Sequence, residues 1–196
     1  FALDKPLYVF ASHAHQDHFN FAIFGLGKTH PNVTYILSRD IKRKWSAAGF
    51  ARHGVSKETY DAMVFLGAHE TKRFGPLCVE TFASTDAGVA FLISACGETI
   101  FHAGDLSDWK MEGAGDLING KMKRTYQHEI RKLAELPINV AFIPTDPRLG
   151  EYQFNGLDFF LKNTDAEFVF PMHMWQDYSG IAAYKKRISN LGMANR

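Results

Sequence analysis

Residues 13–18, HAHQDH, place three histidines and an aspartate within six positions, directly after the apolar run Leu7–Ala11. On an extended chain the side chains of His13 and His15 point to the same side, so both imidazoles can reach one ion. Asp17 and His18 lie where the chain is expected to turn into a helix, and they can face a neighbouring ion. This spacing predicts a metal site, whereas the alternative interpretation is a polar loop whose histidines form hydrogen bonds.

Two later segments end in side chains of the same kind. The segment TIFHAGD ends in Gly104 and Asp105, where the glycine allows close backbone approach and the carboxylate can bridge two ions. The segment EFVFPMH ends in His173. Imidazole and carboxylate ligands together suit zinc, iron or manganese better than calcium, which prefers oxygen ligands alone.

The surrounding pattern predicts the elements that position these residues. Strands are expected at Leu7–Ala11, Val33–Leu37, residues 78–84, a hairpin over 89–105 that turns near Cys96 and Gly97, Ala141–Ile143, and Glu167–Phe170. Helices are expected at Phe19–Leu26 with Asp17 as its cap, Lys121–Leu136, near Gly156–Lys162 and near Ile181–Leu191, with a short basic helix or loop over 40–50. Strands that alternate with helices around a central meander indicate an α/β layered domain covering residues 1–196.

Composition narrows the class of protein. Hydrophobic residues make up 46% and charged residues 22%, with a net charge of +1. That balance offers no strong field for nucleic acid or an anionic membrane, and the run Lys42–Lys44 is interpreted as a solvated face. No apolar run approaches the roughly 20 residues that span a bilayer. Cys78 and Cys96 make no disulfide framework, so a cytoplasmic setting is expected.

HAHQDH, followed by FHAGD and then FPMH, resembles the metallo-β-lactamase fold superfamily. The resemblance implies a four-layer αβ/βα sandwich with one or two divalent ions at the edge where the strands end, zinc first and manganese or iron as alternatives. Within the superfamily, the chain is similar to predicted metal-dependent hydrolases related to ascorbate-6-phosphate lactonase. Members usually open with further strands before the histidine-rich segment, and the chain begins at Phe1, so an N-terminally incomplete domain is expected.

The resemblance also implies a ligand set. It assigns His13 and His15 to a first metal, Asp17, His18 and His173 to a second, and Asp105 to the bridge between them.

The sequence departs from the family in the segment FASTDAGVAFLI, where the family usually has a histidine that completes the first site. Ser84 holds that place, and Asp86 is the strong ligand nearby. The first site is therefore either short of one ligand or completed by Asp86, which fits equally well as a turn aspartate.

The segment PTDPRLGEY places Asp146 and Arg148 after a strand end on the same edge. Arg148 is predicted to bind an anionic substrate group with Asp146 and Trp175 beside it, although an Asp146–Arg148 salt bridge explains the pair equally well.

The resulting hypothesis is a hydrolase of a small anionic ester or lactone, in which Asp105 bridges the ions and Asp17 orients the attacking water. A nuclease on the same scaffold and a non-catalytic metal-binding or ligand-sensing module are the alternatives. A small-molecule partner is expected, nucleic acid and membrane are not, and a homo-oligomer remains open.

Overall fold

Nine strands among the described residues form two sheets in the computed structural model, which describes residues 4–190. The smaller sheet is parallel and contains β1 (Leu7–Ala11), β2 (Val33–Ser38) and β3 (Val64–Leu66) in that order. The larger sheet contains β4 (Thr71–Phe74), β5 (Leu77–Ala83), β6 (Val89–Ala95), β7 (Glu98–His102), β8 (Val140–Pro144) and β9 (Phe168–Met172) in chain order. Its neighbours are antiparallel as far as β7 and parallel from β7 to β9.

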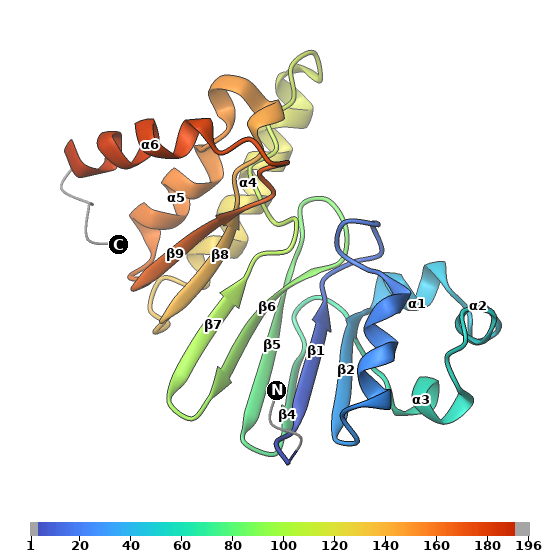
Figure 1. Ribbon diagram of the computed structural model, residues 1–196. Coiled ribbons are helices and arrows are strands. Elements are labelled where there is room, and N and C mark those ends of the chain that lie inside the picture. The colour runs from blue at the N-terminus through green and yellow to red at the C-terminus, as the bar shows by residue number, and fades with distance from the viewer. Residues whose placement is uncertain (1–3, 191–196) are drawn as a thin grey trace.

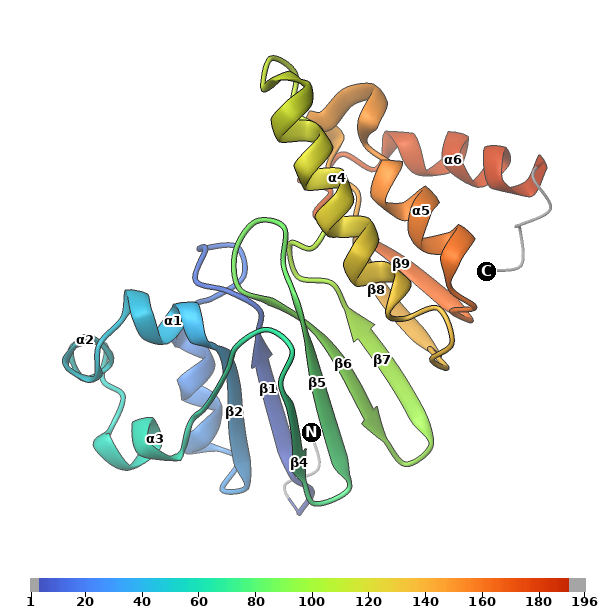
Figure 2. The same ribbon diagram turned by 180° about the vertical axis from the view of Figure 1, so that it is seen from behind.

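The helices gather on two opposite sides of the sheets (Figure 1, Figure 2). Beside the smaller sheet lie α1 (Arg39–Lys44), α2 (Ala47–Arg52), α3 (Lys57–Ala62) and the 3-10 helix η1 (Phe21–Lys28). Beside the larger sheet lie α4 (Gly115–Arg131), α5 (Asn155–Asn163), α6 (Ser179–Asn190) and the 3-10 segment η2 (Pro147–Tyr152). Among the described residues, no helix has the length and apolarity needed to cross a bilayer.

Three apolar cores separate these layers, and the alternation of side chains along each strand explains them. In β2, Leu37 packs under the first set of helices, whereas Ile36 points into the core between the two sheets. In β6, Phe91 points into that same middle core, whereas Leu92 packs under α4–α6. The order is therefore helices, sheet, sheet, helices, which confirms the predicted four-layer sandwich.

Several predicted boundaries need correction. The helix expected at Phe19–Leu26 is the 3-10 helix η1, and its cap is Asn20, whose side chain accepts a hydrogen bond from the Ala22 amide at 2.8 Å, rather than Asp17. The helix expected at Lys121–Leu136 starts and stops earlier, as α4, and turns follow it before Pro137. The end of the last predicted helix, Leu191, lies outside the described residues.

The sequence pattern also missed α3, β3 and β4. Strand β4 has the sequence TKRF and is largely exposed, so it lacks the alternation of apolar and polar side chains that marks a strand in a sequence.

This topology gathers several strand ends at one edge of the molecule. Strands β7, β8 and β9 are parallel, so the loops that follow them emerge on the same side. The loop between β5 and β6 reaches the end of β1, where the Val89 amide donates a hydrogen bond to the Ser12 carbonyl at 3.0 Å. Every metal-ligand candidate predicted from the sequence lies on one of these loops or on the segment that follows β1.

A buried carboxylate connects α4 to the base of the β5–β6 loop. Glu129 accepts hydrogen bonds from Lys132 Nζ at 2.7 Å and from the Ala83 amide at 3.2 Å, and it pairs with His69 Nε2 at 3.0 Å. Burial alone would raise the pKa of Glu129, but the Lys132 and His69 side chains lower it below its usual value.

The Glu129→Gln variant is therefore expected to be less stable at pH 7, by about 1–3 kcal/mol in the free energy of unfolding. Because the folded pKa is lowered, the ionised carboxylate stabilises the fold above the unfolded pKa of about 4.3, and this contribution disappears as pH falls through the folded pKa. Urea unfolding of both proteins from pH 7 down to about pH 3 should show the difference shrinking with acid. The exposed Glu135→Gln variant is the control, and a difference independent of pH would contradict the role of the charge.

Candidate metal centre

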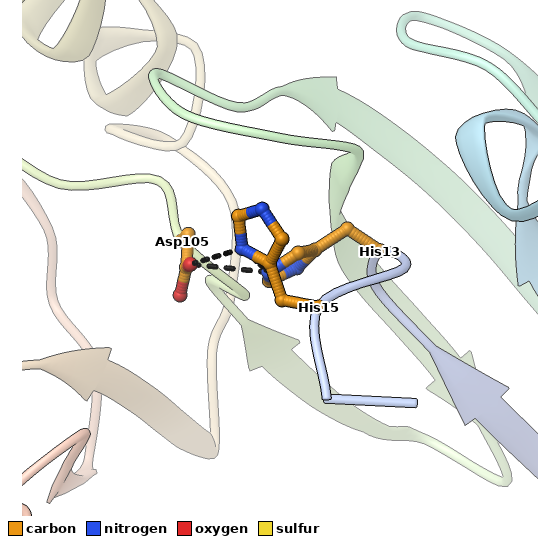
Figure 3. Close-up of side chains that lie close together, drawn as sticks. All are labelled: His13, His15 and Asp105. Atoms are coloured by element: carbon orange, nitrogen blue, oxygen red, sulfur yellow. Dashed lines mark hydrogen bonds and ion pairs between the residues drawn. The ribbon is translucent and has the colours of Figure 1, made fainter. Parts of the chain in front are cut away.

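The first predicted group of ligands converges on one oxygen of Asp105 (Figure 3). His13 Nε2 lies 3.1 Å from Asp105 Oδ2, and His15 Nδ1 lies 4.0 Å from the same oxygen. The two ring nitrogens are 3.0 Å apart. His13 and Asp105 are buried, whereas His15 is half exposed, so the group opens to solvent on one side.

The second group lies beside the other oxygen of the same carboxylate. Asp17 Oδ2 is 3.5 Å from His18 Nε2 and 3.4 Å from His173 Nε2. Asp105 Oδ1 is 3.1 Å from His18 Nε2 and 3.7 Å from His173 Nε2. Asp105 therefore stands between the two groups, with one oxygen directed at each, as a bridging carboxylate would.

The charges in this cluster are strongly coupled. Burial alone would raise the pKa of Asp105, but the adjacent His13 and His18 side chains hold it well below its usual range. Burial alone would lower the pKa of His18, but the Asp105 carboxylate raises it. The carboxylate is ionised at neutral pH, as a metal ligand must be.

The donor set fits a divalent transition metal. The ligand atoms of each group lie within 4.8 Å of one another. Around tetrahedral zinc, with bonds of 2.0–2.1 Å, neighbouring ligand atoms are about 3.3 Å apart, close to the shorter separations here. Asp105 Oδ1 is buried and, although His18 Nε2 lies 3.1 Å away, it accepts no hydrogen bond from the described residues. Nitrogen and oxygen donors without sulfur suit zinc, iron or manganese.

Two glycines allow the loops to approach the end of β1. Gly88 and Gly104 adopt the left-handed backbone conformation, with φ of +67° and +53°. A Cβ at Gly88 would lie 1.9 Å from the Ser12 carbonyl oxygen, and one at Gly104 would lie 2.7 Å from Ser12 Cβ. Only glycine fits at these positions, which bring Asp105 and the β5–β6 loop next to His13.

Asp86 lies beside the first group on the β5–β6 loop. Its Oδ2 is 3.8 Å from His15 Nδ1, and both side chains are about half exposed. Its amide donates to Ser84 Oγ at 3.2 Å, as in the turn interpretation. Asp86 can therefore form the turn hydrogen bond and lie beside His15 at the same time. Its role as the additional ligand of the first metal stays a prediction.

Asp146 has three side-chain partners at the edge of the candidate site. Its side chain is buried and pairs with Arg148, as the alternative interpretation predicted. It also contacts His173 Nδ1 at 2.9 Å and accepts a hydrogen bond from Trp175 Nε1 at 3.1 Å. Burial would raise the pKa of Asp146, but the hydrogen bonds from Arg148 lower it. These contacts allow Asp146 to orient both His173 and Arg148. Its predicted contact with substrate stays a prediction.

Replacing Asp146 with Ala is expected to weaken metal binding at the group that contains His173 by about 10- to 100-fold, because the ring loses the acceptor that orients it. A zinc titration against a chromophoric competitor measures this. Asp158→Ala, which removes an aspartate of α5 paired with Arg187, is the matched control. Unchanged zinc affinity in Asp146→Ala would refute the orienting role.

The two groups border an open cavity of about 490 Å³. Its lining comprises His15, Asp17, Asp86, Asp105, Trp109, Met111, Met122, Asp146, Arg148, Leu149 and His173. Met111, Arg148 and Leu149 also line a neighbouring cavity of about 670 Å³, formed by the segment after Trp109 and by η2. Trp175 lies outside both linings, but its ring lies under the Arg148 guanidinium at 4.4 Å.

Sequence reasoning missed residues that hold the ligands in place. Thr85 Oγ1 donates to the Ser107 carbonyl at 2.7 Å and accepts from the Ser107 amide at 2.9 Å, which fixes the loop after Asp105. Trp109 Nε1 donates to the Asp105 carbonyl at 2.7 Å. No sequence signal marks Thr85, because its partner is 22 residues away.

Solved structures match the fold of this chain at low sequence identity. The diiron β-hydroxylase CmlA from Streptomyces venezuelae shares 14% identity over 94% of this chain and 42% of its own, with a TM-score of 0.58. Zn²⁺-bound PqqB from Methylobacterium extorquens shares 13% identity over 92% of this chain and 66% of its own, with a TM-score of 0.54. The chain has the metallo-β-lactamase fold.

The metallo-β-lactamase SMB-1 is matched over 72% of this chain and 59% of its own, with 17% identity and a TM-score of 0.45. Neither a family model nor a curated protein sequence matches the chain. The chain spans less than half of CmlA and just under two thirds of PqqB. At these identities the likeness shows the fold, and the narrower resemblance to ascorbate-6-phosphate lactonase stays a prediction.

Proposed function

We propose that this chain is a metal-dependent hydrolase that acts on a small anionic ester or lactone. The observation that carries the proposal is the position of Asp105, whose two oxygens face two separate clusters of histidine and aspartate at the edge of one cavity. The metallo-β-lactamase fold supports the proposal, and so do the metals printed for matched structures, zinc for PqqB and two irons for CmlA.

The residues divide into two sites. His13, His15 and Asp105, with Asp86 beside them, would hold one ion, and Asp17, His18, Asp105 and His173 would hold the other. Zinc is the metal proposed, with manganese and iron as alternatives. When bound, such ions supply a Lewis acid for the scissile oxygen and lower the pKa of a water from 15.7 to about 7.

The remaining chemistry belongs to side chains around the cavity. Asp17 is part-exposed and borders the cavity, so its carboxylate can accept a hydrogen bond from the attacking water and orient it. Arg148 also borders the cavity, and its guanidinium is held by the buried Asp146 and by the ring of Trp175. A guanidinium fixed in this way is preorganised to bind a carboxylate or phosphate group of the substrate.

Removal of metal is expected to abolish hydrolysis, and zinc, manganese or iron should restore it, because no side chain here replaces the Lewis acid. Elemental analysis of the chain should find two equivalents of metal, or one if the site of His13 and His15 is incomplete. Matched pairs of anionic and neutral lactones and esters, with phosphodiesters alongside, define the substrate class. The anionic member of each pair should react faster because of Arg148.

Full activity in the metal-free chain would refute the proposal. A chain that binds metal but hydrolyses none of these compounds would instead favour the metal-binding or ligand-sensing module. Salt-dependent binding of RNA or DNA, together with phosphodiester cleavage, would favour the nuclease.

A further inference from the structure

The hydroxyl of Ser12 lies between histidines from the two proposed metal sites. Ser12 Oγ is 3.1 Å from His13 Nδ1 and 3.4 Å from His18 Nδ1. The side chain is buried, with 4% of its surface exposed. A single hydroxyl therefore contacts one ligand of each group.

The same two rings meet Asp105 at their other ends. His13 Nε2 and His18 Nε2 each lie 3.1 Å from a different oxygen of Asp105. The ring centroids are 4.1 Å apart. The two imidazole rings thus lie side by side, with Nδ1 of each facing the Ser12 hydroxyl and Nε2 of each facing the Asp105 carboxylate.

The arrangement bears on which nitrogen of each imidazole ring carries the hydrogen. A neutral imidazole that presents a lone pair at Nε2 carries its hydrogen on Nδ1, and that N–H needs an acceptor when it is buried. A serine oxygen has two lone pairs, so it can accept from two N–H donors at once.

We propose, on the basis of the proposed function, that Ser12 is a positioning residue for His13 and His18. It keeps the hydrogen of each ring on Nδ1, which leaves Nε2 of each ring free to bind metal. Loading of the two metal sites is then coupled through one hydroxyl.

The hydroxyl has little freedom to move. The Ser12 carbonyl accepts a hydrogen bond from the Val89 amide at 3.0 Å. Gly104 packs against the side chain so closely that an added Cβ would lie 2.7 Å from Ser12 Cβ and 3.0 Å from Ser12 Oγ. This packing orients Oγ toward both rings, which is what a positioning role requires.

The test is a competitive zinc titration of the full chain and its Ser12→Ala variant. Both equivalents of zinc should bind about 10- to 100-fold more weakly in the variant, as is typical when the partner of a metal-binding histidine is removed. Ser12→Thr keeps the hydroxyl and should bind close to wild-type affinity. Ser94→Ala, at a hydroxyl in the β6–β7 hairpin, is the matched control. Weakening of only one equivalent, or of neither, would overturn the coupling.

Nitrogen-15 NMR of the histidine rings gives a second readout, which a merely structural role would not change. In the zinc-loaded chain, His13 and His18 should both carry hydrogen on Nδ1, and zinc bound through Nδ1 of either ring would overturn the proposal. Thermal unfolding of the metal-free variants confirms that they are folded.

This readout also separates failure of the inference from failure of the proposed function. If the wild-type chain binds no metal, the proposed function fails. Nitrogen-15 NMR of the histidine rings in the metal-free chain then tests the role of Ser12. Hydrogen on Nδ1 of both rings in the wild type, lost in Ser12→Ala, would support it, and unchanged rings would overturn it.

Discussion

Asp105→Asn is expected to lose metal from both groups and to lower the rate of hydrolysis by about 10³-fold, since loss of the bridge removes several kcal/mol of transition-state stabilisation. The asparagine side chain has nearly the same size, but it offers one neutral oxygen where Asp105 has an ionised oxygen facing each group. Without this carboxylate the first group has two imidazoles with Asp86 beside them, and the second has Asp17 as its one carboxylate, so less negative charge compensates two cations. Elemental analysis and the lactone and ester assays measure the two effects separately.

The matched control is Asp108→Asn, which makes the same chemical change at a buried aspartate three positions later. Asp108 lies outside both groups of candidate ligands among the described residues. It should therefore retain the metal and the activity of the wild-type chain. Two equivalents of tightly bound metal in Asp105→Asn would refute the bridging role, whatever the activity.

Gly88→Ala is expected to be the most damaging single-methyl change near the site. The added Cβ would lie 1.9 Å from the Ser12 carbonyl oxygen and 2.5 Å from His13 Cβ, and neither atom belongs to the end of a flexible side chain. The left-handed backbone, with φ of +67°, adds roughly 1–2 kcal/mol. Relief of the clash requires the β5–β6 loop to move away from β1, so we expect a total loss of about 3–5 kcal/mol in the free energy of unfolding.

Comparison with Gly75→Ala separates the steric part of this effect from the cost of the left-handed backbone. Gly75 has a similar φ of +57°, but an added Cβ would meet nothing within 4 Å. Urea unfolding of both variants should give a loss near 1 kcal/mol for Gly75→Ala and a several-fold larger loss for Gly88→Ala. Equal losses would mean that the approach of the β5–β6 loop to Ser12 is not as close as the structure shows.

The sequence predicted most of the strands because their patterns are local. β1, β2 and the hairpin of β6 and β7 are apolar runs bounded by turn residues, and a buried strand needs little else to be recognised. Strand β4, which the pattern missed, is short and largely exposed, and pairing with β5 rather than its own pattern makes it a strand.

For the candidate site, the residue types and their order along the chain were sufficient to predict which side chains would meet. His13, His15, Asp17 and His18 are adjacent in the sequence, and Asp105 and His173 follow strands that a layered sheet brings to one edge. The sequence thus determined the ligand candidates and the place of the site, and its resemblance to the metallo-β-lactamase fold superfamily implied the four layers.

Tertiary structure alone decided how those ligands are held. Asp146 orients His173 across 27 residues, and Ser12 reaches His18 only because the chain turns back over its own strand end. The contact of Asp146 with His173 joins the separate loops that follow β8 and β9. The physical reason is that hydrogen-bond partners and burial depend on how loops pack against one another. The spacing of residues along a single element does not predict that packing.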